Sequence, residues 1–404
     1  MKKTKSFTYI DLFAGCGGLS LGLHQAGWNG LFAIEKNIDA FKTLNYNLIK
    51  QKKHFSWVNW LEKKNYDINV VLDNHAEDLK KLRGKIDLIV GGPPCQGFSM
   101  AGQRRESDLR NQLIFSYMKF VDLVQPKLIL FENVRGFTMK FDNDNEDARP
   151  YSEIVLEELK KLKYDVDGKV LNFGDFGVPQ RRKRFILAGV LNGTEGDAKH
   201  FFDLLEKEKE HFFNQKNIDA NTTVGDAISD LLFQHGTEIS PDTKSFLAGK
   251  YGVQSSGLQT ELRCSKFITG EVADSHRFAN HTKKTVSSFE RLMKIEGKGK
   301  RISKEILVAA GIKKRGLAVL DASQKSPTLT TIPDDLIHYS EPRILTVREY
   351  ARIQTFPDFY EFKGKYTTGG HLRKVDVPRY TQIGNAIPPL FGELAGRVLK
   401  KMLK

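Results

Sequence analysis

Residues 7–26 constrain the fold of this chain more than any other stretch. An apolar strand, residues 7–13, runs into the turn Ala14-Gly15-Cys16-Gly17-Gly18, and apolar residues then recur at helical spacing. Strand, glycine turn and helix in this order form the first unit of a nucleotide-binding, doubly wound α/β sheet. The turn has the pattern GxGG rather than GxGxxG, which disfavours a dinucleotide. We interpret Cys16 as a small packing residue.

Two acidic side chains follow strands in this first region. Residues 30–34 predict a second strand that ends in Glu35, the position from which a carboxylate binds ribose hydroxyls. Residues 70–72 predict a weak third strand, and Asp78 beyond it is placed to accept a hydrogen bond from an adenine amino group. An ordinary helix-start aspartate is the alternative for Asp78. We read residues 49–69 as a surface insertion.

A single cysteine stands at the end of the next predicted strand. Residues 86–90 form an apolar run that ends in Gly91-Gly92-Pro93-Pro94, followed directly by Cys95. Ligands of open α/β sheets bind at the carboxyl ends of the strands. The alternative is a thiol that fills a gap in the core. Because the small or polar residues Gln96, Gly97 and Ser99 follow, we favour a nucleophile.

A glutamate and a run of cations extend this candidate site. Residues 127–131 predict a buried strand that ends in Glu132. Residues 181–184 read Arg-Arg-Lys-Arg and enter another buried strand, 185–190. Period-two alternation sends Arg182 and Arg184 to one face, where they converge on a ligand or on Glu132. A basic patch that only contacts phosphates is the alternative.

The chain divides into three predicted regions. Residues 1–190 form the catalytic domain, residues 191–341 lose the α/β rhythm and form a mostly irregular or β domain, and residues 342–404 return to complete the first domain. Helices are expected over residues 39–48, 111–124 and 154–162, and a strand over 164–172. Thr346 and Glu349 form a capping box. Residues 101–110 read as a loop that closes over a substrate, and cations cluster at 298–301 and 313–315.

Composition limits the partners and the compartment. The 404 residues include 63 Lys and Arg against 49 Asp and Glu, a net charge of +14 that favours a nucleic acid partner, although compositional bias is an alternative. No apolar run reaches membrane-spanning length, and residues 1–5 lead straight into a strand, so we expect a soluble cytoplasmic protein without a membrane partner. Three distant cysteines suggest neither a disulfide framework nor a metal site.

These features suit one type of reaction. Hydride transfer needs no thiol, and acyl transfer by a thiol requires a histidine base, which has no suggestive position here. A thiolate that adds to an electron-poor ring carbon uses the thiol, the glutamate and the arginines together. The carbon next to the attacked one then becomes nucleophilic and takes a methyl group from a sulfonium donor.

The chain resembles the cytosine-C5 DNA methyltransferases. The resemblance rests on eight stretches in the family's order, which span nearly the whole chain: residues 11–18, Glu35, residues 91–99, 108–113, 131–134, 178–184, 345–352 and 382–389. The Pro-Pro-Cys-Gln turn together with Glu-Asn-Val and Gln-Arg-Arg-x-Arg is highly specific. The resemblance implies a doubly wound, Rossmann-like S-adenosylmethionine-dependent domain with an inserted target-recognition domain.

The resemblance also assigns roles. Cys95 would add to cytosine C6, Glu132 would engage N3 and the amino group, and Arg182 and Arg184 would steady the base and the Glu132 carboxylate. S-adenosylmethionine would bind to Phe13, Ala14, Gly15, Cys16, Gly17, Gly18, Leu19, Glu35, Asp78, Pro94, Leu113 and Asn385. Double-stranded DNA, with the target cytosine flipped out, would contact Gln96, Ser99, Arg110, Thr328 and Leu329.

The expected protein is a monomeric modification enzyme of a prokaryotic or phage restriction-modification system, because no long amino-terminal regulatory region precedes the first motif. A tRNA cytosine-C5 methyltransferase is one alternative, which the Gln96 to Ser99 continuation and the long insertion disfavour. A catalytically silent DNA-binding regulator is another, and pure binding does not require Cys95, Glu132 and Arg182.

Overall fold

A computed structural model describes residues 6–94, 112–140, 149–295, 297–309, 312, 316–368 and 376–403. The chain forms two compact units. Unit 1 comprises Met1–Asn172, Lys183–Lys209 and Gly392–Lys404, and unit 2 comprises Phe173–Arg182 and Glu210–Phe391. The domain limits at 190 and 341, which mark where the α/β rhythm of the sequence stops and returns, stay predictions.

Unit 1 is built on a mixed six-stranded sheet. Its strand order is β2 (Asn29–Ile34), β1 (Thr8–Leu12), β3 (Leu88–Gly91), β4 (Leu128–Val134), β7 (Lys183–Leu191), β5 (Tyr164–Asn172). The pairs among β2, β1, β3 and β4 are parallel, whereas β7 runs antiparallel to both β4 and β5. The predicted α/β fold is thus present with a mixed sheet.

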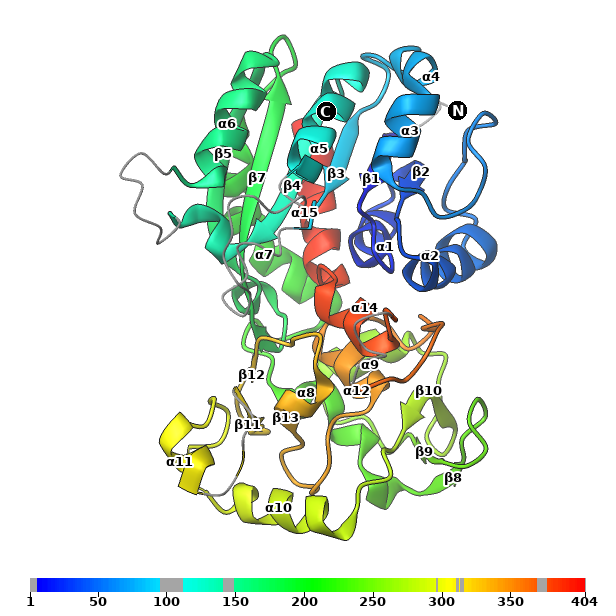
Figure 1. The fold of residues 1–404 in the computed structure, drawn as a ribbon, viewed down its shortest axis with the longest axis vertical. Helices are drawn as coiled ribbons and strands as arrows, with labels where there is room; N and C mark the ends of the chain where they lie inside the picture. Colours follow the sequence, from blue (N-terminus) through cyan, green and yellow to red (C-terminus); the bar gives the residue numbers. More distant parts are fainter. Residues whose placement is uncertain are drawn as a thin grey trace. The chain divides into compact units, whose positions relative to one another are not determined.

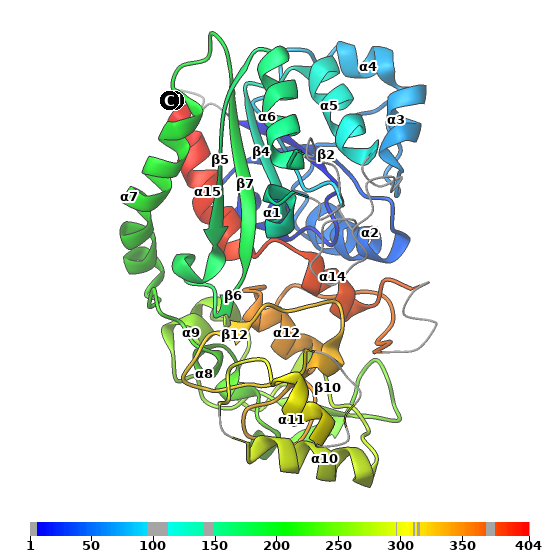
Figure 2. The same ribbon diagram turned by 60° about the vertical axis from the view of Figure 1, so that its left-hand side comes forward.

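Helices cover both faces of this sheet. Those of unit 1 are α1 (Gly18–Gln25), α2 (Ile38–Leu44), α3 (Ile68–Asn74), α4 (Ala76–Lys80), α5 (Gln112–Val124) and α6 (Tyr151–Lys161), and α7 (Ala198–Lys216) and α15 (Pro389–Met402) continue into unit 2. Figures 1 and 2 show α5 and α6 on one face and α15 on the other. The indole of Trp28 donates to the carbonyl of Gly396 at 2.8 Å, which joins the first strands to the carboxyl-terminal helix.

The predicted third strand at residues 70–72 is wrong: these residues belong to α3. The Asp67 side chain caps this helix by accepting from the backbone N–H of Asn69 at 3.0 Å. Ile68, Val71 and Leu72 are buried while Val70 is 45% exposed, which is helical and not strand periodicity. Three apolar residues are too few to distinguish the two periods from sequence.

The segment 49–69 is not only a surface insertion. Phe55, Trp57 and Leu61 are buried, and Phe55 forms a parallel bridge with Gly30 of β2. The segment therefore extends the core beyond the edge of the sheet. Its aromatic residues show no periodic spacing in the sequence because the backbone that carries them is irregular.

Unit 2 contains short elements. Its strands are β6 (Gln180–Arg181), β8 (Thr237–Ile239), β9 (Leu247–Lys250), β10 (Val272–Arg277), β11 (Ala318–Val319), β12 (Ser326–Pro327) and β13 (Leu336–Ile337). Its helices include α8 (Val224–Ile228), α9 (Gly257–Arg263), α10 (Lys283–Met293), α11 (Lys304–Ala309), α12 (Val347–Ile353) and α14 (Arg379–Asn385). The predicted capping box of Thr346 and Glu349 is confirmed at the start of α12.

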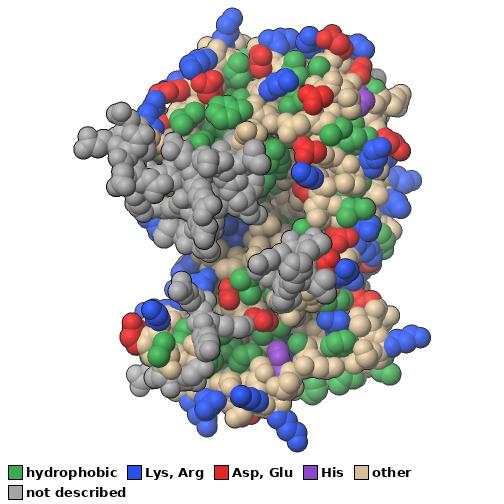
Figure 3. All heavy atoms as spheres, in the orientation of Figure 1, with side chains coloured by type: hydrophobic (Ala, Val, Ile, Leu, Met, Phe, Trp, Pro, Cys, Tyr) green, Lys and Arg blue, Asp and Glu red, His purple; other side chains and the backbone are tan. Residues whose placement is uncertain are grey.

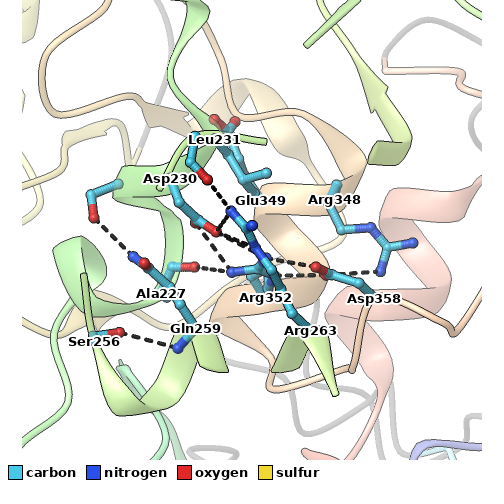
Figure 4. Close-up of polar contacts among 12 residues, drawn as sticks. Ala227, Asp230, Leu231, Ser256, Gln259, Arg263, Arg348, Glu349, Arg352 and Asp358 are labelled. Carbon is cyan, nitrogen blue, oxygen red and sulfur yellow. Dashed lines mark hydrogen bonds and ion pairs between the residues drawn. The ribbon is translucent and has the colours of Figure 1, made fainter. Parts of the chain in front are cut away.

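Buried ion pairs join three helical segments of unit 2 (Figure 4). Asp230, which follows α8, accepts from Arg263 of α9 at 2.5 Å and from Arg352 of α12 at 3.3 Å. Arg352 also donates to Asp358 at 2.6 Å. Burial alone would raise the pKa of Asp358, but the Arg352 guanidinium holds that pKa below its ordinary value. All these side chains are at most 1% exposed, so each charge needs its partner.

We expect Asp230→Ala to lower the free energy of unfolding by about 3–5 kcal/mol, because it leaves Arg263 and Arg352 short of a buried counter-charge. Glu238→Ala is the matched control: it removes an exposed partner of Lys250 and should cost less than about 1 kcal/mol. Equilibrium urea unfolding measures both. Equal costs for the two variants would contradict the proposed importance of the buried pairs.

Candidate active site

The candidate site begins where β3 and β4 end. The two strands are parallel and in register, with Gly91 opposite Phe131, so the Gly92-Pro93-Pro94 turn leaves β3 beside Glu132, which β4 still carries. The buried Asn133 side chain donates from Nδ2 to the carbonyl oxygen of Pro93 at 3.2 Å. This hydrogen bond ties the turn that precedes Cys95 to the strand that carries Glu132.

An ion pair orients the glutamate. Arg184, opposite Val134 in the antiparallel β4–β7 pair, places its Nε 2.9 Å from Glu132 Oε1. Each side chain is only 14% exposed. Burial lowers the pKa of the Arg184 guanidinium, and the Glu132 carboxylate acts in the opposite direction. A charge-assisted contact between two nearly buried groups restricts the carboxylate to one orientation.

Gly92 leaves room for this carboxylate. A Cβ atom at position 92 would lie 2.8 Å from Glu132 Oε2 and 3.2 Å from the Glu132 carbonyl oxygen. Any side chain here would therefore displace the carboxylate or the strand end. Glycine is required at this position because of the neighbouring glutamate.

The turn after β1 has three residues with positive φ and free space beside its backbone. Phe13, Gly15 and Gly17 have φ values of 59°, 55° and 89°, and nothing lies within 4 Å of the position of a Cβ at Gly15. The Glu35 carboxylate fixes this turn by accepting from the backbone N–H groups of Gly15 at 2.9 Å and Asn37 at 2.6 Å. A carboxylate accepts about four hydrogen bonds, so Glu35 retains capacity for ligand hydroxyls. The arrangement fits an adenosine-type ligand.

A buried carboxyl links the strand before the turn to the helix after it. Asp11 of β1 accepts from Ser20 Oγ at 2.5 Å. Burial raises the pKa of Asp11 to about 7, the Ser20 hydrogen bond opposes this, and the nearby Glu35 adds to it. Cys16 is 1% exposed, and burial raises the pKa of its thiol far above its ordinary value. Cys16 is therefore a packing residue, as predicted.

Comparison with known proteins identifies the family. The family profile described as C-5 cytosine-specific DNA methylase matches residues 7–402. The Type II methyltransferase M.DdeI of Desulfomicrobium norvegicum is 31% identical over 96% of this chain and 88% of its own. The Type II methyltransferase M.XorII of Xanthomonas oryzae pv. oryzae is 30% identical over 98% and 85%. The chain belongs to the C-5 cytosine-specific DNA methylase family.

Solved structures agree with this assignment. A crystal structure described as a prophage-encoded DNA modification methyltransferase (E. coli) matches with a TM-score of 0.67 and 26% identity, covering 98% of this chain and 99% of that one. The S. pombe Dnmt2 methyltransferase, at 17% identity and a TM-score of 0.52 over 99% and 98% of the two chains, shares the fold. This protein is a DNA (cytosine-5-)-methyltransferase, and enzymes of its family use S-adenosylmethionine as methyl donor.

The two arginines that flank Lys183 have different partners in the methyltransferase. Arg184 is confirmed as a partner of Glu132. Arg182 belongs to unit 2, is 1% exposed, and donates to the carbonyl oxygens of Leu329 at 3.2 Å and Gly384 at 2.8 Å. It lies in the break between β6 and β7, where period-two alternation is interrupted. Its role toward the base or Glu132 stays a prediction.

The other predicted site residues are dispersed. Cys95, Gln96, Ser99 and Arg110 lie outside the described residues. Pro94 is exposed and Leu113 is half-buried on the first turn of α5. Asp78 lies in α4, where it pairs with Lys81 at 2.9 Å, and Asn385 is an exposed residue at the end of α14. Their cofactor roles stay predictions.

Thr328 and Leu329, the predicted DNA contacts of unit 2, are joined to the Gln180-Arg181-Arg182 motif. Thr328 Oγ1 donates to the Arg181 carbonyl oxygen at 2.6 Å. The Leu329 N–H donates to Gln180 Oε1 at 2.9 Å, and its side chain is 1% exposed. The buried Leu329 therefore fixes the position of Thr328, which is the more accessible of the two.

Two positioning residues carry only weak signals in the sequence. Asn133 is visible only as part of Glu-Asn-Val, although an asparagine after a glutamate near a strand end is a candidate anchor for a neighbouring turn. Gln180 is visible only as part of a motif, yet its side chain bonds to both Gln354 and Leu329 within unit 2. Among the described residues, no group of His, Cys, Asp or Glu could hold a metal ion. None of the described helices combines the length and apolar character that crossing a bilayer requires.

We expect Gly92→Ala to reduce methyl transfer about 100-fold, because the added Cβ displaces the Glu132 carboxylate and a misplacement of about 1 Å in a catalytic group has this effect. Single-turnover kinetics with labelled donor measures the rate. Donor binding and the thermal unfolding temperature should stay near wild type. Wild-type turnover in Gly92→Ala would refute the requirement for an unobstructed carboxylate.

Asp11 gives a pH-dependent prediction. Its folded-state pKa of about 7 exceeds the model-compound value of 3.8, so between these pH values the folded protein retains a proton that the unfolded chain has released. The contribution of Asp11 to stability is full below about pH 4 and is lost as pH rises toward 7. Asp11→Asn should therefore gain stability relative to wild type across this window. Parallel urea-unfolding profiles of the two proteins against pH would contradict the prediction.

Proposed function

We propose that this enzyme transfers a methyl group to C5 of cytosine in one short sequence of double-stranded DNA, as the modification enzyme of a restriction-modification system. The observation that carries the proposal is the Glu132–Arg184 pair beside the turn that leads into Cys95. The Type II methyltransferase names of the relatives support the modification role. We expect the enzyme to act as a monomer.

The proposed chemistry is covalent. The Cys95 thiolate forms a bond to C6 of the cytosine while Glu132 engages N3 and the exocyclic amino group, which makes the ring a better electron acceptor. The electron pair displaced from the C5–C6 bond makes C5 the nucleophile that takes the methyl group, and the electrons of the donor's S–CH3 bond stay on the sulfur, which leaves as a neutral thioether. Transfer of the C5 proton to a base then restores the C5–C6 double bond and releases Cys95 as a thiolate. Arg184 holds the carboxylate in place throughout.

The methyl donor would be held by the turn after β1. S-adenosylmethionine supplies an electrophilic methyl group when bound. Glu35 would receive the ribose hydroxyls while it fixes the backbone of the turn, and Asp78 would lie near the adenine. The remaining contacts are proposed for Phe13, Ala14, Gly15, Cys16, Gly17, Gly18, Leu19, Pro94, Leu113 and Asn385.

The DNA substrate must deliver a base from inside a duplex, so we propose that the cytosine flips out of the helix. Gln96, Ser99, Arg110 and Thr328 would contact the DNA, with Leu329 positioning Thr328 and Arg182 steadying the base. Unit 2 would contain the target-recognition region.

A basic segment of unit 2, defined as residues 283–304, suits contacts with phosphates. It contains eight Lys and Arg residues against two Glu. Lys283, Lys284, Lys294, Lys300 and Lys304 are exposed and have no carboxylate partner among the described residues, whereas lysines such as Lys161 and Lys209 do. Figure 3 shows Lys and Arg side chains gathered over α10. Such cations bind a duplex without regard to its sequence.

The test offers labelled S-adenosylmethionine and the purified protein to unmodified genomic DNA and, separately, to bulk tRNA. We expect label at cytosine C5 within one short DNA motif, located by bisulfite sequencing. Cys95→Ser should lose turnover and retain DNA binding, because only the covalent step needs the thiol. Label found only in tRNA would make tRNA, and not DNA, the substrate. Label in neither nucleic acid would refute the proposal.

A further inference from the structure

A guanidinium stacked between two aromatic rings stands apart from the other arginines of unit 2. The Arg277 guanidinium carbon lies 4.0 Å from the ring centroid of Phe246 and 3.8 Å from that of Tyr366. Arg277 ends β10 and is paired with Ala248 of β9, so Phe246, which directly precedes β9, is its diagonal neighbour. The two rings hold the guanidinium plane from both sides.

One of these rings is itself locked. The Tyr366 hydroxyl donates to Asp242 at 2.6 Å, and Arg379 donates to the same carboxylate at 2.8 Å while its guanidinium lies 4.1 Å from the Tyr366 ring centroid. The pKa of Asp242 is held below its ordinary value: burial raises it, but the Tyr366 hydroxyl and the Arg379 guanidinium outweigh that effect. Tyr366 is therefore a fixed platform for Arg277.

An irregular strand directs Arg277 to this position. The register between β9 and β10 shifts between Val272 and Arg277, and Ser275 has a φ of 59°, which is uncommon for a residue other than glycine. Arg379 donates to the Ser275 hydroxyl at 2.9 Å and stabilises the bend. Bulges of this kind re-aim side chains near functional sites.

Arg277 lacks the partners that its neighbours have. Of the described arginines of unit 2 that are not exposed, the others donate to carboxylates or backbone carbonyls: Arg182, Arg263, Arg343, Arg348, Arg352 and Arg379. Arg277 instead has a buried Nε without a hydrogen bond and one contact, Nη1 to Thr243 Oγ1 at 3.5 Å. Burial lowers the pKa of Arg277, and the opposing charge of Asp242, to which Arg277 makes no hydrogen bond, does not outweigh it.

We propose that Arg277 is a base-reading residue that donates two hydrogen bonds to the O6 and N7 atoms of a guanine in the recognition sequence. A guanidinium held between rings can be approached only along its edge, and the guanine edge offers two acceptors in one plane. This inference rests on the proposed function in that the guanine belongs to the DNA substrate. Phosphates need no such constraint, and the flexible lysines of the basic segment suit them.

The experiment selects bound duplexes from a randomised pool with full-length protein, so it needs no turnover. Wild type should yield a consensus that contains a guanine, and Arg277→Met should lose the preference at that position alone, by about 10- to 100-fold. Arg277→Lys keeps the charge but not the planar fork, so it should lose the same preference. This second variant also tests the proposal should the methionine variant unfold.

Arg291→Met is the matched control, because Arg291 is an exposed arginine of α10 within the basic segment. It should keep the full consensus and weaken binding to all duplexes alike, with a shallower salt dependence. A uniform loss in Arg277→Met would make Arg277 a phosphate contact, and an unchanged consensus would make it structural; either result overturns the proposal. If Arg277→Met loses the preference for the guanine but the wild-type protein methylates no DNA, the result refutes the proposed function and not the role of Arg277.

Discussion

The parallel register of β3 and β4 is the constraint on which the candidate site depends. It brings two chain segments about 40 residues apart to the same edge of the sheet, one that continues into the proline turn and one that carries Glu132. The direction of β7 completes the arrangement. Because β7 runs antiparallel to β4, its first residues reach that edge, and Arg184 is opposite Val134 instead of at the far end of the sheet. A parallel β7 would have removed the counter-charge of the glutamate.

The parts of this site that follow from local pattern could be predicted from the sequence. Apolar runs marked the strands, and the polar residues at the strand ends marked Glu35 and Glu132. Strand direction could not be predicted, because an apolar run reads the same in either orientation. The partners of Arg182 were equally inaccessible: Leu329 and Gly384 lie 147 and 202 residues away in sequence. Helix α3 was missed because its buried face spans one turn.

The interior of unit 2 is stabilised differently from that of unit 1. Its elements are short, and charged side chains such as Asp230 and Arg352 join them in the interior. Taking these ions out of water costs more than burying apolar groups of the same size, and only a complete set of partners compensates. Such a network tolerates few alternative arrangements, so we infer that it specifies the geometry of loops that carry little secondary structure of their own.

The contrast between Arg184 and Arg277 shows how one side-chain type serves two purposes. Arg184 is committed to Glu132, so its guanidinium orients that carboxylate. Arg277 has the same fork but is held by two rings, which restrict its plane and leave donors without strong partners. A desolvated guanidinium with poorly satisfied donors is unfavourable in the free protein, and a ligand with two in-plane acceptors relieves that cost. Preorganised strain of this kind discriminates between base pairs, because a wrong base leaves the donors unpaired.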